Sequence, residues 1–477
     1  MACTSCNLLR KSLSAITSPL GVIRTEYSIS SMKNFADIPS ARGLPLIGTT
    51  LSLLMAGSAP KLHKYIDKRH KQLGPIFKES IGPVPCVFIS EPEAMRLVYA
   101  HEGKYPVHLL PEAWTTYNTL YNVSRGLFFM NGPEWLHFRK ILNPLLLKGD
   151  QGWLEECCRP AIESLVEDLG TERNMEEMLY KWSLEVMVSV LVGVSKYRDV
   201  RDGLNLKMTN LASKINRVFE DSAKLSLISA KFAAKYRIYR WRRFEASVTA
   251  ALRSAADLVD LLSQNQLQSD EGLIGKLRGK MTQNELSKIV TDLILSAGDT
   301  TAYSMEWLLY LVGKHSDIQG KLRGCLDKDR PPTSSPYLKN VIKESLRLYP
   351  VAPFLTRILP EAVVLKNYEI PAGTVLILSI YTTGRDERYF VRPKVFDPDR
   401  WERREIKSSI AQSAALPFAI GARSCIGRKL AELQLQATLA EIVKRFEFKV
   451  LNKHEVDVIL KMVAVPSEEL KFSFRRL

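Results

Sequence analysis

The ten residues Phe418–Gly427 read FAIGARSCIG and set one cysteine, Cys425, between two glycines and ahead of a helix-forming run, RKLAELQLQATLAEIVKRF. Gly421 and Gly427 allow the backbone to turn tightly and to pass close to a flat ligand, because glycine has no Cβ. A helix N-terminus lowers the pKa of a nearby thiol, so the sequence predicts that Cys425 is ionised and able to bind a metal ion. The alternative is a buried cysteine that acts only as a small hydrophobic side chain.

The residues around Cys425 favour its role as a metal ligand over that of a buried hydrophobic side chain. It matches the pattern FxxGxRxCxG at all of its fixed positions, and it resembles the proximal loop of the cytochrome P-450 family. The resemblance implies that Cys425 is the axial ligand of the iron of haem b. It also implies that Phe418 packs over the proximal side of the haem and that Arg423 pairs with a haem propionate through its planar guanidinium.

The composition is that of a globular protein with an excess of positive charge. The 477 residues carry a formal net charge of +16, with 46% hydrophobic and 25% charged residues. Besides a solvated basic surface, this charge suits an acidic protein donor or an anionic membrane surface. Nucleic acid is disfavoured, because the chain has no nucleic-acid-binding motif and no concentrated basic tail. Seven scattered cysteines, an odd number, argue against a disulfide framework.

The first 34 residues have the composition of a mitochondrial transit peptide. They are rich in serine and threonine and carry four basic residues against a single acid, Glu26. They contain no apolar run of about 20 residues that would span a membrane. The alternative is a tail without a targeting role. We therefore predict a transit peptide over residues 1–34 and a haem-thiolate monooxygenase domain over residues 35–477, on the matrix side of the inner mitochondrial membrane.

Helix-type periodicity dominates the chain. From Glu91 onward, apolar residues mostly recur three and four positions apart, whereas strand-like runs are confined to IFKESIG, CVFIS and a patch near residues 363–380. The predicted fold class is mainly α with a minor β lobe, which by resemblance is the cytochrome P-450 fold. The longest helix is predicted to begin at Thr282, where TQNE forms a capping box, and to end near Lys314.

The middle of this long helix carries the polar stretch SAGDTTAYS, residues 296–304. Its small residues leave room beside the helix, and Asp299 and Thr300 are poor helix formers, so a locally weakened helix is predicted. The stretch resembles the distal pattern (A/G)Gx(D/E)T(T/S), although Ser296-Ala297 replaces the usual small pair. The resemblance implies that Thr300 positions dioxygen and that Asp299 relays protons to it. The alternative is a helix kink with buried polar residues.

Three charged residues are predicted to support the scaffold. Glu344 and Arg347, in KESLRLYP, are three positions apart and therefore share one helix face. They resemble the ExxR pair of the family, with Arg400 of FDPDRW as the third member. Because buried charges must be paired, the trio is predicted to be structural and to fix the backbone that leads to the cysteine loop.

Three further residues are implied as haem contacts. Trp135 and Arg139, in WLHFR, are four positions apart and resemble the WxxxR pair that reaches the haem propionates. Arg357, in PVAPFLTRIL, is implied as another propionate ligand. For each arginine taken alone, a surface salt bridge is the alternative.

A separate electron donor is required, because the chain has no flavin- or nicotinamide-binding signature. Lys339 and Lys343 are four positions apart and form one basic stripe on the outside of the Glu344 helix. They resemble the ferredoxin-docking lysines of mitochondrial cytochromes P-450, and Arg428 and Lys429 add positive charge beside the cysteine. The implied partner is an acidic mitochondrial ferredoxin with its reductase. The alternative is a pair of solvated lysines.

A second basic segment suggests contact with the inner membrane. Residues 231–243, KFAAKYRIYRWRR, interleave Tyr236, Ile238, Tyr239 and Trp241 with lysines and arginines. The aromatic side chains of such a segment can lie at a membrane interface. The alternative is an amphipathic helix packed on the core.

The substrate is implied by two longer segments, EGKYPVHLLPEAWTTYN and GLFFMNGPEWLHFRKILNPLLLKGD. They resemble mitochondrial steroid hydroxylases of the insect ecdysteroid pathway, so hydroxylation of a steroid is expected, at carbon 2 of an ecdysteroid precursor. One alternative is another sterol or lipophilic substrate. Alternatives from other classes are a non-catalytic haem sensor or carrier and a haem-thiolate isomerase, neither of which needs the Asp299-Thr300 relay.

Overall fold

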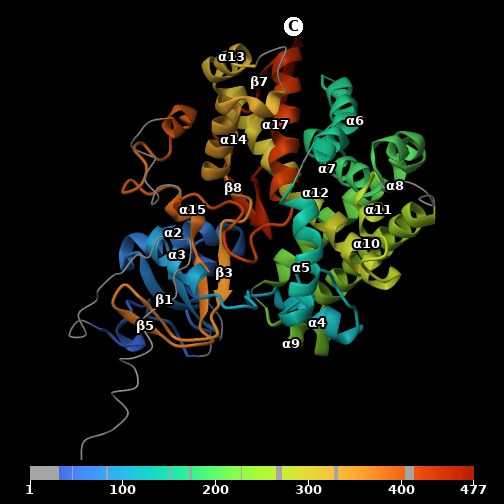
Figure 1. Ribbon diagram of the computed structural model, residues 1–477. Helices are drawn as coiled ribbons and strands as arrows, with labels where there is room; N and C mark the ends of the chain where they lie inside the picture. Colours follow the sequence, from blue (N-terminus) through green and yellow to red (C-terminus); the bar gives the residue numbers. More distant parts are fainter. Residues whose placement is uncertain are drawn as a thin grey trace, which may run out of the picture.

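The protein is described here by a computed structural model that covers residues 32–477 apart from 46, 82–83, 150–151, 171–173, 227, 265–270, 327–330 and 403–412. The predicted transit peptide, up to residue 31, lies outside the described residues. The predicted fold class is confirmed: a large helical lobe adjoins a smaller lobe that contains most of the strands (Figure 1).

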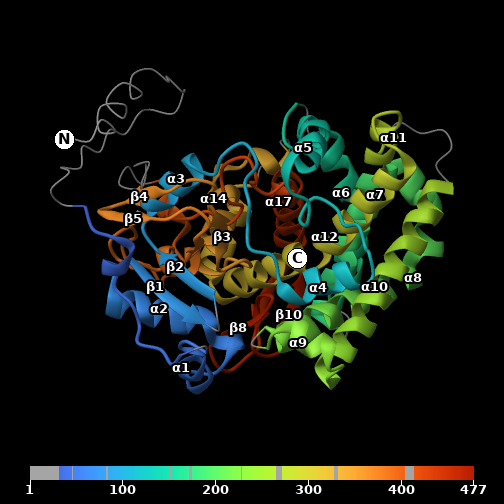
Figure 2. The same ribbon diagram turned by 90° about the horizontal axis from the view of Figure 1, so that it is seen from below.

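The helical lobe is built around α12, which packs against α7, α8, α10, α14 and α17 (Figure 2). The α-helices are α1 (Thr50–Met55), α2 (Leu62–Leu73), α3 (Pro92–Ala100), α4 (Glu112–Leu120), α5 (Gly132–Leu146), α6 (Gly152–Asp168), α7 (Met175–Val192), α8 (Val194–Leu225), α9 (Ala230–Lys235), α10 (Tyr239–Gln264), α11 (Leu273–Leu277), α12 (Gln283–Lys314), α13 (Ser316–Gly324), α14 (Pro336–Leu348), α15 (Ile380–Thr383) and α17 (Arg428–Arg445). Short 3-10 helices are η3 (Phe35–Asp37), η4 (Ala59–Lys61), η5 (Pro332–Ser334) and η6 (Pro398–Trp401). No helix among the described residues is both long enough and apolar enough to span a bilayer.

The largest sheet joins early and late parts of the chain. Its strands are β1 (Ile76–Ile81), β2 (Val84–Ile89), β6 (Val375–Leu378) and β3 (Leu355–Ile358), in that order. β2 and β6 are parallel, with Cys86 opposite Val375, whereas the other pairs are antiparallel. Three two-stranded sheets complete the fold: β4 (Val363–Leu365) with β5 (Tyr368–Ile370), β7 (Phe446–Val450) with β10 (Phe472–Arg476), and β8 (Val458–Lys461) with β9 (Val463–Pro466).

The long helix α12 begins and ends as predicted. Thr282 Oγ1 accepts a hydrogen bond from the Glu285 amide at 3.3 Å, and the Glu285 carboxylate accepts one from the Thr282 amide at 2.8 Å. The predicted weakening near residues 296–300 does not interrupt the helix. Ser183 of α7 donates its hydroxyl to the Ala297 carbonyl at 2.8 Å, so the neighbouring helix supports α12 at this point.

Candidate functional site

The proximal loop, residues 418–427, ends directly before α17. The Cys425 amide donates to the Phe418 carbonyl at 2.9 Å, which closes the loop, and Phe418 is partly buried against the core. Gly421 has a φ of 82°, and a Cβ at this position would collide with the carboxylate of Glu102, so glycine is required there. Gly427 has an ordinary φ of −83°. The backbone conformation of Gly427 is therefore open to other residues, and the predicted close approach of a flat ligand at this position stays a prediction.

The environment of Cys425 contains the predicted donors, but their net effect differs from the prediction. The Gly427 amide, Arg139 and Arg428 all lower the pKa of the thiol. Cys425 is exposed on one side, yet protein atoms surround the sulfur on its other sides, and this desolvation outweighs the donors and raises the pKa. The expected lowering of the pKa by the loop alone is wrong, because the loop amides and arginines do not compensate for the loss of water. A cation bound to the sulfur would favour the thiolate.

Three arginines from distant parts of the chain meet beside this loop. Arg139 of α5 donates to the Ser424 carbonyl at 3.0 Å, and Arg423 lies 4.6 Å from the centroid of the Trp135 ring. Burial lowers the pKa of Arg423 to about 10, and the positive charges of Arg357 and Arg139 add to this effect. The cluster is therefore a buried concentration of positive charge.

Two residues that the sequence did not single out complete the cluster. Glu102 accepts from Arg357 Nε at 2.7 Å and from the Ala422 amide at 2.6 Å, and it is 4% exposed. His108 Nδ1 lies 3.0 Å from Arg423 Nη1, and burial lowers the pKa of His108 to about 3. Both residues lie in the segment EGKYPVHLL, which carried only a resemblance and no motif of its own. No signal in the sequence alone pairs them with arginines more than 200 positions away.

The unpartnered polar atoms of this cluster fit a haem. Arg139 Nε, Arg357 Nη2, Arg423 Nε and His108 Nε2 are buried and have no hydrogen-bond partner among the described residues. Buried donors are rarely left unpaired, so these atoms indicate an anionic group at this place. Within the described part of the chain, Glu102 is the one carboxylate that forms an ion pair with an arginine of this cluster. The two carboxylates of a haem, held next to a cysteine ligand, match this donor set.

The predicted proton-relay pair occupies two faces of α12. Thr300 is exposed and donates its hydroxyl to the Ser296 carbonyl at 3.1 Å. Asp299 is 1% exposed, and neither carboxylate oxygen has a partner among the described residues. Burial raises the pKa of Asp299 well above its usual range, and the negative charge of Glu176 adds to the shift. Burial therefore favours the neutral form of the Asp299 carboxyl, next to the exposed hydroxyl of Thr300.

The comparison with family sequences shows which family the chain belongs to. The sequence model of the family described as "Cytochrome P-450" matches residues 38–474. The chain belongs to the cytochrome P-450 family. It is therefore a haem-binding monooxygenase, and the arginine cluster and Cys425 are the parts of this cytochrome P-450 that fit the cofactor.

Individual relatives cover nearly the whole chain. "Cytochrome P-450 315a1, mitochondrial" of Drosophila melanogaster is 38% identical over 94% of this chain and 91% of its own length. The mitochondrial 1,25-dihydroxyvitamin D(3) 24-hydroxylase of Rattus norvegicus is 29% identical, over 93% of this chain and 90% of its own. The mitochondrial cholesterol side-chain cleavage enzyme of Oncorhynchus mykiss is 27% identical, over 94% of this chain and 91% of its own length. A solved cyanobacterial cytochrome P-450 with retinoic acid bound has a TM-score of 0.74 at 21% identity, covering 92% of this chain and 99% of that chain, which shows the fold.

The structure brings the predicted scaffold trio together in the core of this cytochrome P-450. Glu344 Oε1 lies 2.7 Å from Arg347 Nη2 and 2.7 Å from Arg400 Nε, and all three side chains are almost fully buried. The Asp397 amide also donates to Glu344, at 3.1 Å. Arg347 in turn donates to the Pro393 carbonyl, so the trio binds α14 to the segment before η6.

The predicted docking residues lie on the outside of α14 and at the start of α17. Lys339 and Lys343 are exposed, although burial lowers the pKa of Lys343. Arg428 and Lys429 each lie 3.9 Å from the carboxylate of Glu432. α14 and α17 pack against each other, so these basic side chains belong to neighbouring helices (Figure 1).

The predicted membrane segment, residues 231–243, is only partly exposed. Phe232, Tyr236 and Tyr239 are 56%, 60% and 64% exposed, but Trp241 is 1% exposed and lies in the core. The inclusion of Trp241 in a membrane-facing surface is therefore wrong, because this indole packs between α10 and the helical core. A second exposed apolar group lies on α1, where Leu51, Leu54 and Met55 are 51%, 49% and 83% exposed.

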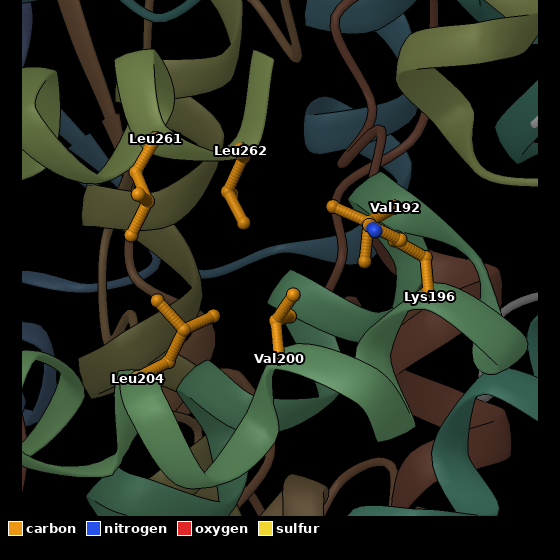
Figure 3. A pocket seen from close by; sticks show the side chains of 6 residues that line it. All are labelled: Val192, Lys196, Val200, Leu204, Leu261 and Leu262. Atoms are coloured by element: carbon orange, nitrogen blue, oxygen red, sulfur yellow. The ribbon is translucent and has the colours of Figure 1, made fainter. Parts of the chain in front are cut away.

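A small pocket between the end of α7, α8 and α10 contains none of these residues (Figure 3). Figure 3 shows its lining, which is apolar except for one lysine: Val192, Lys196, Val200, Leu204, Leu261 and Leu262. A single lysine among aliphatic side chains offers no acid, base or nucleophile pair. The pocket is best explained as imperfect packing between helices.

Proposed function

We propose that this cytochrome P-450 is a mitochondrial steroid hydroxylase that acts at carbon 2 of an ecdysteroid precursor. The observation that carries the proposal is the identity of 38% over 94% of the chain with a mitochondrial cytochrome P-450 of Drosophila, together with mitochondrial relatives named for vitamin D and cholesterol. The assignment of carbon 2 as the oxidised position rests on the similarity of two long segments to ecdysteroid hydroxylases. A mitochondrial location on the matrix side of the inner membrane agrees with the transit-peptide composition of residues 1–34.

The residues around the haem have separate roles in this proposal. The haem, when bound, supplies oxygen activation, and the reaction consumes one dioxygen, two electrons and two protons to give the hydroxylated steroid and water. Cys425 would bind the iron, while Arg139, Arg357 and Arg423, which have unpartnered buried nitrogens among the described residues, would pair with the haem carboxylates. Thr300 would present its hydroxyl to the bound oxygen, and Asp299, whose protonated form is favoured by burial, would supply protons to it.

Three segments from distant parts of the chain contact one another. Val107 forms an isolated antiparallel β-bridge with Ile358, and the Leu109 amide donates a hydrogen bond to Thr356 Oγ1 at 3.0 Å. The Ala464 amide donates to the Val351 carbonyl at 2.8 Å. These mostly apolar segments suit a lipophilic ligand that is oriented by few polar groups.

An acidic mitochondrial ferredoxin is the proposed electron donor, supplied by its reductase. The support is the exposed stripe of Lys339 and Lys343 on α14, next to Arg428 and Lys429 on α17. Opposite charges steer such partners together, and the attraction weakens as salt is added. The inner membrane surface is the proposed second partner, through the exposed apolar side chains of α1 and α9.

The deciding experiment uses the purified, haem-loaded protein with a mitochondrial ferredoxin and its reductase. A panel of ecdysteroid precursors and other sterols is incubated with it, and the position of the new hydroxyl is determined by NMR. We expect a 2-hydroxylated ecdysteroid that forms only when the donor is present. Oxidation of another carbon would reject the substrate assignment but leave the enzyme class intact, and turnover without a donor would reject the role of the ferredoxin.

A further inference from the structure

Among the described residues, Asp299 forms no hydrogen bond through which it could regain a proton. Its carboxyl is buried, and neither oxygen has a hydrogen-bond partner among the described residues. An acid that supplies a proton in each turnover must be reprotonated before the next one. The groups that surround Asp299 therefore determine how its carboxylate is reprotonated.

Glu176 of α7 is the acid whose negative charge acts on Asp299. Two contacts place both residues in the same layer between α7 and α12. A Cβ on Gly298 would lie 3.7 Å from the Tyr180 ring, and Tyr180 lies one helical turn after Glu176. The rings of Tyr180 and Tyr303 meet edge to face, with centroids 5.6 Å apart, and Tyr303 lies one turn after Asp299.

Tyr303 holds the Glu176 carboxylate toward α12. Its hydroxyl donates to Glu176 Oε1 at 2.7 Å, and Asn216 of α8 donates to the same oxygen at 3.1 Å. Tyr303 is 3% exposed, whereas Glu176 is only partly buried. Glu176 thus combines a fixed position in the buried layer with access to solvent, which Asp299 lacks.

We propose that Glu176 is the proton donor that recharges Asp299, and that Tyr303 positions Glu176 for this role. The proposal rests on the proton-supplying role of Asp299 in the proposed function. In the step itself, one proton leaves the Glu176 carboxyl, passes through a bridging water molecule and binds the Asp299 carboxylate, and Glu176 then takes a proton from the solvent. No electron moves, and no other reactant is consumed.

The other charged groups around Asp299 set the pH range of the relay. Lys461 of β8 lowers the pKa of Asp299, but it is paired with Glu220 of α8 at 2.8 Å. Glu306, two turns further along α12, is buried, and burial together with the charge of Glu176 raises its pKa to about 8. Because Glu176 raises the pKa of Asp299, removing its charge should lower that pKa.

The test compares Glu176→Gln with Glu177→Gln in the haem-loaded enzyme. Glutamine can still accept the Tyr303 hydrogen bond, and both glutamates lie in the first turn of α7, so both variants lose the same favourable interaction with the helix N-terminus. Glu177 is exposed and serves as the control. For Glu176→Gln we expect turnover to fall by roughly 10²-fold, with a larger solvent deuterium isotope effect. Glu176→Asp should recover part of the loss.

A second measurement does not depend on turnover. The infrared band of the protonated Asp299 carboxyl, identified by its loss in Asp299→Asn, should titrate at a lower pH in Glu176→Gln than in the wild type. Haem content and the dissociation constant for the steroid should be unchanged in both glutamine variants. These readouts separate a proton relay from a structural role.

The outcomes for the two acids are distinguishable. If Asp299→Asn is impaired but Glu176→Gln behaves like Glu177→Gln in turnover and isotope effect, the relay through Glu176 is rejected and the role of Asp299 stands. If Asp299→Asn itself turns over normally, the proposed role of Asp299 fails first. Loss of haem or of steroid binding in Glu176→Gln would assign this residue to the fold and would also reject the relay.

Discussion

The ammonium group of Lys343 lies 3.8 Å from the centroid of the Trp401 ring. The same indole donates from Nε1 to Glu344 Oε2 at 3.0 Å. Trp401 therefore touches both a proposed docking lysine and the buried trio that binds α14 to the segment before η6. Lys339, four residues earlier on α14, forms no such contact with Trp401 among the described residues, so the two lysines of the stripe are not equivalent.

This difference predicts how each lysine contributes to docking. Lys339→Gln should raise the KM for ferredoxin several-fold at low salt, because an exposed charge contributes through steering. Lys343→Gln should have a similar effect and should also destabilise the protein slightly, since a cation over an indole contributes about 0.5–1 kcal/mol at an exposed site. The KM for ferredoxin, the dissociation constant for the steroid and the free energy of unfolding are to be measured for each. Lys207→Gln, an exposed lysine of α8, is the control. Equal losses of steroid binding and of donor-dependent turnover would contradict the docking role.

Glu344 is predicted to be indispensable for folding. Glu344→Gln leaves the charges of Arg347 and Arg400 buried without a compensating anion, which costs about 3–5 kcal/mol. We expect little haem-loaded protein and a large loss in the free energy of unfolding, measured by denaturant titration. Glu402→Gln is the matched control, because Glu402 is exposed and accepts a hydrogen bond only from Asn340 among the described residues. A stable Glu344→Gln protein with full haem content would refute the structural role.

The sequence predicted those parts of the site that local patterns determine. The capping box at Thr282, the fold class and the position of Cys425 before a helix all follow from residues within a few positions of one another. Glu102 and His108 could not be predicted in the same way, because their partners Arg357 and Arg423 are distant in the chain and meet them only in the folded protein. Such long-range pairing is set by packing, which no single local pattern contains.

The errors have the same origin. Trp241 was assigned to a membrane surface from composition, but the orientation of α10 turns its indole into the core. The pKa of Cys425 was expected to be lowered by its donors, but desolvation by the whole surrounding protein is the larger effect. Both quantities depend on burial, and burial is a property of the fold rather than of neighbouring residues.

Replacing the proposed iron ligand should change the spectrum rather than only the activity. We expect Cys425→His to lose the red-shifted Soret band that a thiolate ligand gives in the reduced carbon monoxide complex, together with turnover. Cys325→Ser, a change at an exposed cysteine, should keep both. The reduced carbon monoxide spectrum of each purified variant is the measurement. A wild-type spectrum in Cys425→His would remove Cys425 from the coordination of iron.

His63 is predicted to make the protein sensitive to acid. It is fully buried, both ring nitrogens lack partners among the described residues, and burial lowers its pKa to about 4. In the unfolded chain the imidazole titrates near pH 6.5, so between these values the unfolded state binds a proton that the folded state does not. The contribution of His63 to the free energy of unfolding is therefore fully present above about pH 6.5. It is lost as the pH falls toward 4, and the loss amounts to about 3 kcal/mol.

His63→Leu should flatten this dependence, because leucine binds no proton. The free energy of unfolding is to be measured by urea titration at several pH values between about 7 and 4. The exposed His454, changed to leucine, is the control and should leave the acid dependence as it is in the wild type. An unchanged slope in His63→Leu would show that other groups cause the acid sensitivity.

The exposed apolar side chains of α1 should determine membrane affinity. Leu51, Leu54 and Met55 project from a helix of six residues, and in the view of Figure 2 α1 and α9 lie along the same edge of the molecule. Burying half of such a side chain in lipid contributes about 1 kcal/mol, so replacing all three by serine should weaken binding to anionic vesicles by roughly 10²-fold. Vesicle co-sedimentation measures this change. The control is Leu206→Ser, because Leu206 is 72% exposed but lies on α8. If the triple variant sediments as well as this control, basic residues rather than α1 hold the protein to the membrane, and the binding should then disappear at high salt.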